Sequence, residues 1–67
     1  MSLSTYEVSV SSERRSRAGA VAVVRDSYSV RAGTAAQAEL EALQAHWAKY
    51  PDTRDAMMTG CRRLPSR

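Results

Sequence analysis

The sequence contains few of the residues that form disulfides, bind metal ions or act as nucleophiles in a small protein. It has one cysteine, Cys61, and one histidine, His46, among its 67 residues. A single cysteine excludes an intramolecular disulfide. One cysteine and one histidine are also too few ligands for a structural zinc site. A lone free thiol is typical of a reducing compartment, so we expect a cytoplasmic protein.

Long apolar runs and glycine-rich loops are also missing. No run approaches the roughly 18 apolar residues that a membrane-spanning helix needs. The first residues lack the charge and the apolar core of a signal peptide. Gly33 and Gly60 stand alone, so no phosphate-binding loop is expected. The sequence around His46 has no motif that would place a nucleophile or a carboxylate next to it. No local motif supports a catalytic pair of His46 with Cys61 either. We therefore expect no catalytic, cofactor-binding or metal-binding residues, no membrane partner and a protein that is not an enzyme.

The size and charge of the chain favour a protein that depends on partners. A chain of 67 residues makes one domain and buries only about 60% of the surface that its unfolded form exposes. A homodimer or another bound partner would supplement so small a core. The net charge is +3, and nine of the ten basic residues are arginines. Guanidinium groups fork onto phosphate or carboxylate, so the charge permits an acidic partner.

The clearest pattern in the sequence is an amphipathic helix over residues 34–50. At about 100° per residue, one narrow stripe collects the large apolar side chains of this segment, Ala36, Leu40, Leu43, Trp47 and Tyr50. Thr34 is a suitable N-cap, because its hydroxyl can accept from a free first-turn N–H. Pro51 ends the helix. We expect the apolar stripe to be the buried face.

Two extended regions precede this helix. Tyr6, Val8 and Val10 alternate with polar residues over residues 5–11, the period-two pattern of a strand with one buried face. The polar segment 11–19 predicts the loop of a β-hairpin. Residues 20–32 form the second extended region.

The apolar phase changes within the second region. Val21 and Val23 occupy odd positions, whereas Tyr28 and Val30 occupy even ones, with Arg25 and Asp26 between them. Either a β-bulge inside one long strand or a tight turn between two strands would produce such a shift. We favour one long strand.

Residues 56–64 are compatible with two structures. Asp52 or Thr53 could cap a short helix, or the segment could return as a last strand with Gly60 at a bulge. We favour the strand. The expected fold class is α+β, a small antiparallel sheet packed on one amphipathic helix. The residues expected to meet in its core are Tyr6, Val8, Val10, Tyr28, Val30, Leu40, Leu43 and Trp47.

The arginines form two sequence clusters, which we take as candidate partner-binding residues. The first is Arg14, Arg15 and Arg17, and the second is Arg62, Arg63 and Arg67. Clustered arginines can contact phosphates or acidic protein surfaces, although a merely solvated loop is the alternative. No aromatic residue lies among them, so stacking on nucleic-acid bases is not expected.

A second stripe on the helix consists of small residues. Ala38, Ala42 and Ala45 recur at i, i+4 and i+7, on the side opposite the large apolar stripe. Alanine on a solvent face is explained by helix propensity alone. The other interpretation is a flat stripe that a second helix or a second copy approaches closely.

The layout as a whole resembles a known kind of protein. A Tyr-x-Val-x-Val strand precedes a charged segment, a strand ending Tyr28-Ser29-Val30-Arg31-Ala32, and a helix opening Thr34-Ala35-Ala36-Gln37. This arrangement resembles the tiny α+β proteins of phages and mobile elements, including anti-CRISPR inhibitors. The resemblance implies a non-enzymatic inhibitor that occupies a surface of a host protein or nucleoprotein complex. A small nucleic-acid-binding or regulatory module is one alternative, and a dimeric adaptor of the toxin–antitoxin or plasmid type is another. Neighbouring genes would discriminate among the three.

Overall fold

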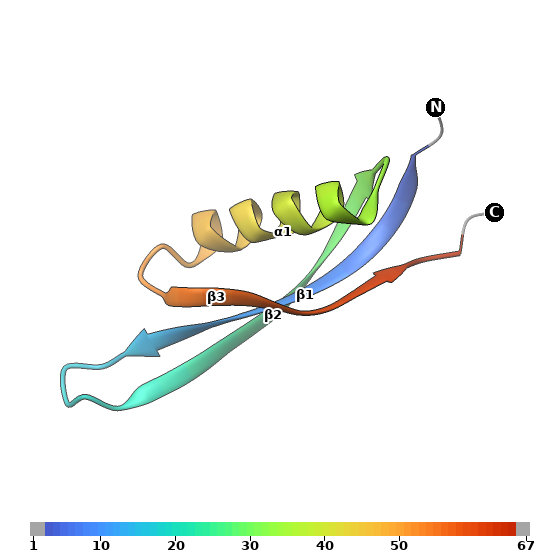
Figure 1. The fold of residues 1–67 in the computed structure, drawn as a ribbon. Coiled ribbons are helices and arrows are strands. Elements are labelled where there is room, and N and C mark those ends of the chain that lie inside the picture. The colour runs from blue at the N-terminus through green and yellow to red at the C-terminus, as the bar shows by residue number, and fades with distance from the viewer. Residues whose placement is uncertain (1–2, 66–67) are drawn as a thin grey trace.

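The fold is a three-stranded antiparallel sheet with one helix across one face. The computed structural model describes residues 3–65. Its elements are β1 (Ser4–Arg15), β2 (Val21–Ala32), α1 (Ala35–Lys49) and β3 (Arg54–Arg63), and the strand order is β2-β1-β3 (Figure 1). This arrangement confirms the predicted α+β fold class.

The β1–β2 hairpin is longer than the sequence pattern predicted. β1 continues to Arg15, so only Ser16–Ala20 form the connection. Gly19 adopts a positive φ of 83°, and the Ser16 N–H donates to the carbonyl of Ala20 at 2.9 Å. The prediction of a loop over residues 11–19 was therefore wrong. Polar side chains can stand on both faces of a hairpin that projects into solvent, so polarity did not mark the end of the strand.

β2 is one continuous strand, as we favoured, but it contains no bulge against β1. The pairing runs without a register shift from Ser4↔Ala32 to Arg15↔Val21. The change of apolar phase has a different cause. Tyr28 and Val30 lie on the face that α1 covers, whereas Val21 and Val23 lie on the opposite face, in the part of the hairpin that extends beyond the helix (Figure 1).

The last segment is a strand, as favoured from the sequence. β3 pairs antiparallel with β1, and the register shifts between Ser9 and Val10 and again between Ser11 and Glu13. Asp55, with a φ of 56°, lies in the second irregular stretch. Bulges of this kind bend an edge strand and blunt its tendency to pair with other chains.

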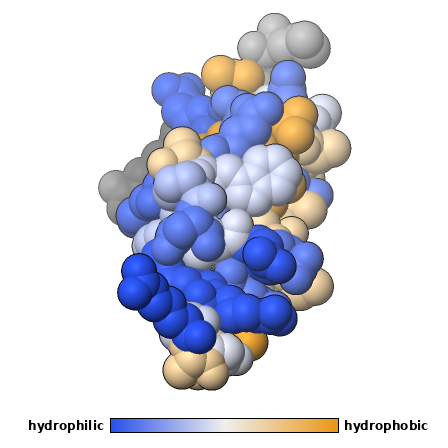
Figure 2. Space-filling view, turned by 90° about the vertical axis from the view of Figure 1, so that its left-hand side faces the viewer, coloured by the Kyte–Doolittle hydropathy of each residue, from blue (hydrophilic) through white to orange (hydrophobic). Residues whose placement is uncertain are grey.

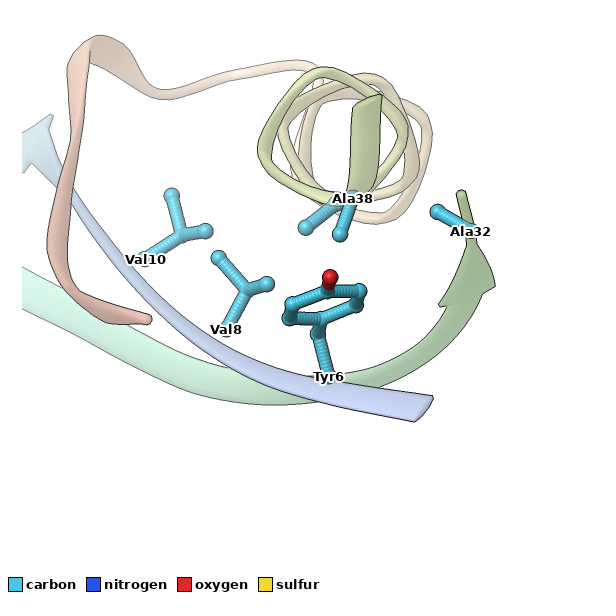
Figure 3. Packing of buried hydrophobic residues seen from close by; sticks show 6 residues of the cluster. Tyr6, Val8, Val10, Ala32 and Ala38 are labelled. Carbon is cyan, nitrogen blue, oxygen red and sulfur yellow. The ribbon is translucent and has the colours of Figure 1, made fainter. Parts of the chain in front are cut away.

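The core lies between α1 and the middle of the sheet. Its fully enclosed apolar members are Tyr6, Val8, Val10, Ala32, Ala38 and Ala42 (Figure 3). The first three were predicted to be core residues, and the structure confirms them. Tyr28, Val30 and Leu43 are partly buried and pack against this cluster.

The buried face of α1 is not the one that its hydrophobic pattern predicted. Ala38 and Ala42 have no exposed surface, whereas Leu40 is 56% exposed and Trp47 is 50% exposed. The prediction that Leu40 and Trp47 belong to the core was therefore wrong. Small side chains let the helix axis approach the sheet closely, and the sheet supplies the bulk through Tyr6, Val8 and Val10 (Figure 3).

The ends of α1 agree with the sequence. The Thr34 hydroxyl accepts from the Gln37 N–H at 3.2 Å, and the Tyr50 N–H donates to the carbonyl of His46 at 2.8 Å. Within residues 3–65, no helix has the length and apolar character that crossing a bilayer requires.

Candidate binding surface on the outer face of the sheet

The sheet has a second face that no element covers within the described residues. Side chains alternate along a strand, so the residues that point away from α1 follow from the register. We call this surface the outer face. Its residues are Thr5, Glu7, Ser9, Ser11, Glu13 and Arg15 of β1, Val21, Val23, Arg25, Ser27, Ser29 and Arg31 of β2, and Arg54, Met57, Gly60 and Arg62 of β3.

The outer face divides into two parts of different chemistry. Toward the termini it is polar, with serines in neighbouring strands. Ser9 and Ser27 are hydrogen-bonded to each other through their hydroxyls at 3.3 Å. Toward the hairpin turn, apolar and cationic side chains alternate across the strands. We call this part the hairpin half, and its exposed residues are Glu13, Arg15, Val21, Val23, Arg25, Arg54 and Met57.

Figure 2 looks at the hairpin end of the molecule. Deep-blue hydrophilic side chains and orange or tan hydrophobic ones share its lower part, where the hairpin lies. Val21 is 51% exposed and Val23 is 58% exposed. These two valines lie beside arginines, so the hairpin half combines apolar and cationic side chains, as surfaces where proteins meet often do.

Most cations of the outer face are not neutralised within the protein. In residues 3–65, ion pairs are formed by Arg14, Lys49 and Arg62 only. Arg62 of the outer face donates to the Glu7 carboxylate at 3.0 Å. The guanidinium groups of Arg15, Arg25 and Arg54 therefore remain available for an external anion.

A shallow depression opens near the middle of the outer face. Its volume is about 440 Å³, and it is lined by Ser9, Val10, Arg25, Asp26, Ser27 and Thr59. It offers hydroxyl groups and one guanidinium to a protruding group of a partner.

The first predicted arginine cluster does not act as a unit. Arg14 faces the helix side of the sheet and donates to both oxygens of Asp52, at 2.6 and 3.1 Å, so it ties β1 to the segment after α1. This hydrogen bond lowers the pKa of the Asp52 carboxyl. Arg15 belongs to the outer face, and Arg17 lies in the hairpin turn.

The second predicted cluster lies far from the first. Because β1 and β3 are antiparallel, Arg62 pairs with Glu7 and Arg63 with Tyr6, near the start of β1. Seven residues of strand separate Glu7 from Arg14, which corresponds to about 23 Å. Arg67 lies outside the described residues. The two clusters therefore do not combine into one basic patch.

The predicted alanine contact stripe is mostly inside the protein. Ala38 and Ala42 are buried against the protein's own sheet, so they cannot present a surface to another molecule. Ala45 is exposed. The small-residue face of the helix does make a close contact, but with the sheet of the same chain.

His46 lies at the end of that buried face and is held by two hydroxyl groups. Its Nε2 is 2.7 Å from the Ser12 hydroxyl of β1, and its Nδ1 is 2.8 Å from the Tyr28 hydroxyl of β2. One ring nitrogen donates and the other accepts, as a neutral imidazole requires. Burial lowers the pKa of His46 below its ordinary value. The Ser12 and His46 side chains are buried, and His46 joins the helix to the central strand β1 through Ser12 and to the edge strand β2 through Tyr28.

A second polar group lies beside this histidine. Asp26 of β2 accepts hydrogen bonds from Lys49, from the Ser27 N–H and from the Tyr50 hydroxyl. The bond from Lys49 is the main reason that the pKa of Asp26 is lowered. In the part of the chain that the structure describes, no three His, Cys, Asp or Glu side chains group as metal ligands would.

Sequence reasoning missed the main residues of the outer face. Arg25 is recognisable in the sequence only as a residue at the change of apolar phase, and nothing in the pattern singles out Arg54. Val21 and Val23 were recognised as strand residues, but their odd phase was taken as a sign of a bulge. The phase itself was the available signal, because residues of opposite parity in one unbroken strand must lie on opposite faces.

Comparisons with known proteins gave no relative. No protein family matches the chain, no curated protein matches it, and no solved structure resembles it closely enough to count as a match.

Proposed function

We propose that this chain is a non-enzymatic binding protein that docks the hairpin half of its outer face onto an acidic surface of a larger protein or nucleoprotein complex. The observation that carries the proposal is the exposed mixture of Arg15, Arg25 and Arg54 with Val21 and Val23 on one uncovered sheet face. An inhibitory role of the phage type is the particular form that the resemblance in layout suggests.

The composition of the hairpin half favours a protein surface over bare nucleic acid. Arginine and exposed apolar side chains are enriched where proteins meet, because the guanidinium forks onto carboxylates while the apolar groups leave water. A phosphate backbone would gain nothing from Val21 or Val23. Glu13 lies between these valines and Arg54 on the same face, and it would repel the carboxylates and the phosphates of a partner alike, so it does not distinguish the two kinds of partner.

Direct binding of duplex nucleic acid is the second candidate. A two-stranded antiparallel ribbon fits the major groove, and the projecting β1–β2 hairpin has this form (Figure 1). Arg25 and Arg31 lie on one face of β2, six residues or about 20 Å apart. The two candidates differ in what the free protein should bind.

The test combines a charge reversal with two kinds of partner. Arg25→Glu together with Arg54→Glu reverses two of the three cations of the hairpin half, and Arg31→Glu with Arg62→Glu is the control at the other end of the same face. A photo-crosslinker at Ser27 should capture a protein from a host extract, and the first pair of substitutions should abolish the capture while the second pair leaves most of it.

Mobility shifts on random duplex and single strands near physiological ionic strength complete the test. We expect weak binding or none. Tight binding that is lost in the Arg25/Arg54 double variant and falls steeply with salt would replace the proposal with the nucleic-acid function. Equal loss of the protein partner in both double variants would show that net charge, and not the hairpin half, recognises the partner.

A further inference from the structure

The two edges of the sheet differ in how well they are protected. β3 carries two register shifts against β1, and its residue Asp55 adopts a positive φ of 56°. Such irregularities bend an edge strand and hinder the addition of another strand. β2 pairs with β1 over 12 residues without a register shift and contains no proline. Along its other side, the part of the chain that the structure describes places no strand, so β2 is a straight and open edge.

The hydrogen bonds of the sheet show which backbone groups point toward this free edge. In an antiparallel pair, residues that bond to each other alternate with residues that direct their N–H and C=O to the other side. The Leu64 N–H donates to the Thr5 carbonyl at 2.8 Å, so the odd-numbered residues of β1 bond to β3 and the even-numbered ones to β2. Odd-numbered residues of β2 face odd-numbered residues of β1, so they direct their backbone groups to the free edge.

Two further contacts agree with this assignment. The Ser16 N–H donates to the carbonyl of Ala20 at 2.9 Å, which closes the hairpin through an even-numbered pair. The N–H of the odd-numbered Ser27 donates to the Asp26 carboxylate at 2.9 Å, so this side chain occupies the edge at that point. Within residues 3–65, the unoccupied stretch on the hairpin side of Ser27 is residues 21–25. Residues 21, 23 and 25 each direct an N–H and a C=O outward there.

Most of this stretch is apolar. Val21, Ala22 and Val23 are exposed, and Val24 is half-buried. Valine favours extended backbone, and a straight, uncharged edge readily pairs with another chain. Natural proteins protect such an edge with charges, bulges or proline, and residues 21–24 contain none of these. The stretch therefore has the properties of a site for strand addition.

The charges around the stretch favour an acidic strand of another protein over a second copy. Arg25 ends the apolar run, and Arg15 faces Val21 from β1, whereas Glu13 faces Val23. An antiparallel pair of copies centred on Val23 would set Arg25 of each copy beside Val21 of the other, with Arg15 one strand further. Guanidinium groups would then outnumber carboxylates on that face, and like charges on neighbouring strands destabilise a sheet. A carboxylate opposite Arg25 forms a favourable cross-strand pair instead.

From these observations we infer that the partner adds an extended segment to the free edge of β2 over residues 21–25, as a fourth strand of the sheet. The segment carries apolar side chains opposite Val21 and Val23 and a carboxylate opposite Arg25. Backbone hydrogen bonds supply affinity, and the alternate side chains supply specificity. The inference rests on the function proposed above, because the partner that docks on the hairpin half is the one that supplies the strand.

The first experiment measures amide hydrogen exchange by NMR in the full chain with a tethered model strand as the probe. A flexible Gly/Ser linker of about 25 residues after residue 67 carries Thr-Val-Thr-Val-Thr-Glu-Thr, and a second version carries the reverse order, so that both strand directions are tested. The linker has an r.m.s. length of about 28 Å, which matches the roughly 26 Å along β1 from Thr5 to Glu13. Tethering raises the effective concentration of the strand to the millimolar range.

The expected result depends on the parity of each residue. In the free chain, the amides of residues 22 and 24 should exchange slowly and those of residues 21, 23 and 25 quickly. The tethered strand should slow the second group about tenfold or more, because these amides become hydrogen-bonded. Replacing the glutamate of the probe by lysine should remove most of this protection, since the lysine would face Arg25. Light scattering should show a monomer in each case.

The second experiment uses the Ser27 crosslinker to separate strand addition from docking of side chains alone. Val23→Pro removes an outward N–H and leaves the bonds to β1 intact, because proline is tolerated on an edge strand where the N–H faces solvent. Val23→Ala keeps the N–H and is the matched control. We expect Val23→Pro to abolish capture of the partner and Val23→Ala to keep most of it. Circular dichroism checks the fold of both variants, and the tethered strand decides the question if Val23→Pro does not fold.

Several results would overturn the inference. Neither tethered strand protecting residues 21, 23 and 25 would refute strand addition, and equal protection by the glutamate and lysine probes would refute the acidic partner. Protection in the free chain that rises with concentration would assign the edge to a second copy. Capture that survives Val23→Pro but is lost with Arg25→Glu and Arg54→Glu would refute strand addition and leave the proposed function standing. Capture that survives all of these substitutions would refute both.

Discussion

The two faces of α1 differ in the opposite sense from what their hydrophobicity suggests. The face with the smallest side chains, Ala38 and Ala42, is buried against the sheet together with a histidine. The face with leucines and the tryptophan remains half exposed. Burial therefore follows fit more than hydropathy, because a helix that lies close to Tyr6, Val8 and Val10 has no room for large residues.

The largest effect is expected when a charge is placed on the buried face of α1 and compared with the same charge at an exposed position of the helix. Ala42→Asp would bury a carboxylate with no partner, which costs several kcal/mol and more than so small a domain can lose. We expect this variant to be unfolded. Ala45→Asp, three residues further along the same helix, should change the free energy of unfolding by about 0.5 kcal/mol or less. Circular dichroism and urea denaturation measure both. A folded Ala42→Asp variant would contradict the assignment of the buried face.

The next effect tests the polar end of the buried face. Ser12→Ala removes one of the two hydroxyls that hold His46 and leaves a ring nitrogen buried without a partner. The free energy of unfolding should fall by about 1–3 kcal/mol. Ser9→Ala on the outer face is the control, since the Ser9 hydroxyl is bonded only to Ser27 at the surface and its loss should cost less. Equal effects in urea denaturation would mean that His46 has another partner.

The pH dependence of stability sharpens the same point. Burial lowers the pKa of His46 in the folded state, so the unfolded chain, with a pKa near the ordinary 6.5, binds more protons in mild acid. The stability that a neutral His46 provides is present above about pH 6.5 and declines as the pH falls below it, by at most about 1.4 kcal/mol per pH unit for one proton. Asp26 and Asp52 have lowered pKa values and act only at lower pH. Urea midpoints measured between pH 7 and pH 5 that do not change would contradict a buried neutral imidazole.

The smallest effect on the fold itself is expected on the face of α1 that points away from the sheet. Trp47→Ala should lower the free energy of unfolding by about 1 kcal/mol or less, because half of the side chain already meets water. The sequence pattern alone predicts a loss of about 3–5 kcal/mol for a core tryptophan. Thermal melts of the Trp47→Ala variant and of the unaltered protein distinguish these values. A loss near the larger value would return Trp47 to the core of the single chain.

The sequence was sufficient for the parts of the fold that local rules control. The period-two pattern of Tyr6, Val8 and Val10 located β1 and its buried face, and Thr34 and Pro51 marked the ends of the helix correctly. These features depend on neighbours in the chain, so they could be read without knowing the tertiary structure. The fold class, a small antiparallel sheet packed on one helix, then followed, but the strand order did not.

The sequence was not sufficient where one element meets another. Both stripes of α1 have a helical period, and hydropathy favours Leu40 and Trp47, so only the space above the sheet shows why Ala38 and Ala42 are the buried pair. The partners of His46 come from β1 and β2, which no spacing links to it. The outer face depends on the register of three strands. That register pairs Glu13 with both Val23 and Arg54, although Val23 precedes α1 in the sequence and Arg54 follows it.

The assignment of the two helix faces is tested most directly by proton distances in solution. In a NOESY spectrum of the protein, the methyl groups of Ala38 and Ala42 should give strong cross-peaks to the side chains of Tyr6, Val8 and Val10. The Trp47 indole should give none to these three. Cross-peaks from the indole to Val8 or Val10, with none from the Ala42 methyl, would contradict the account.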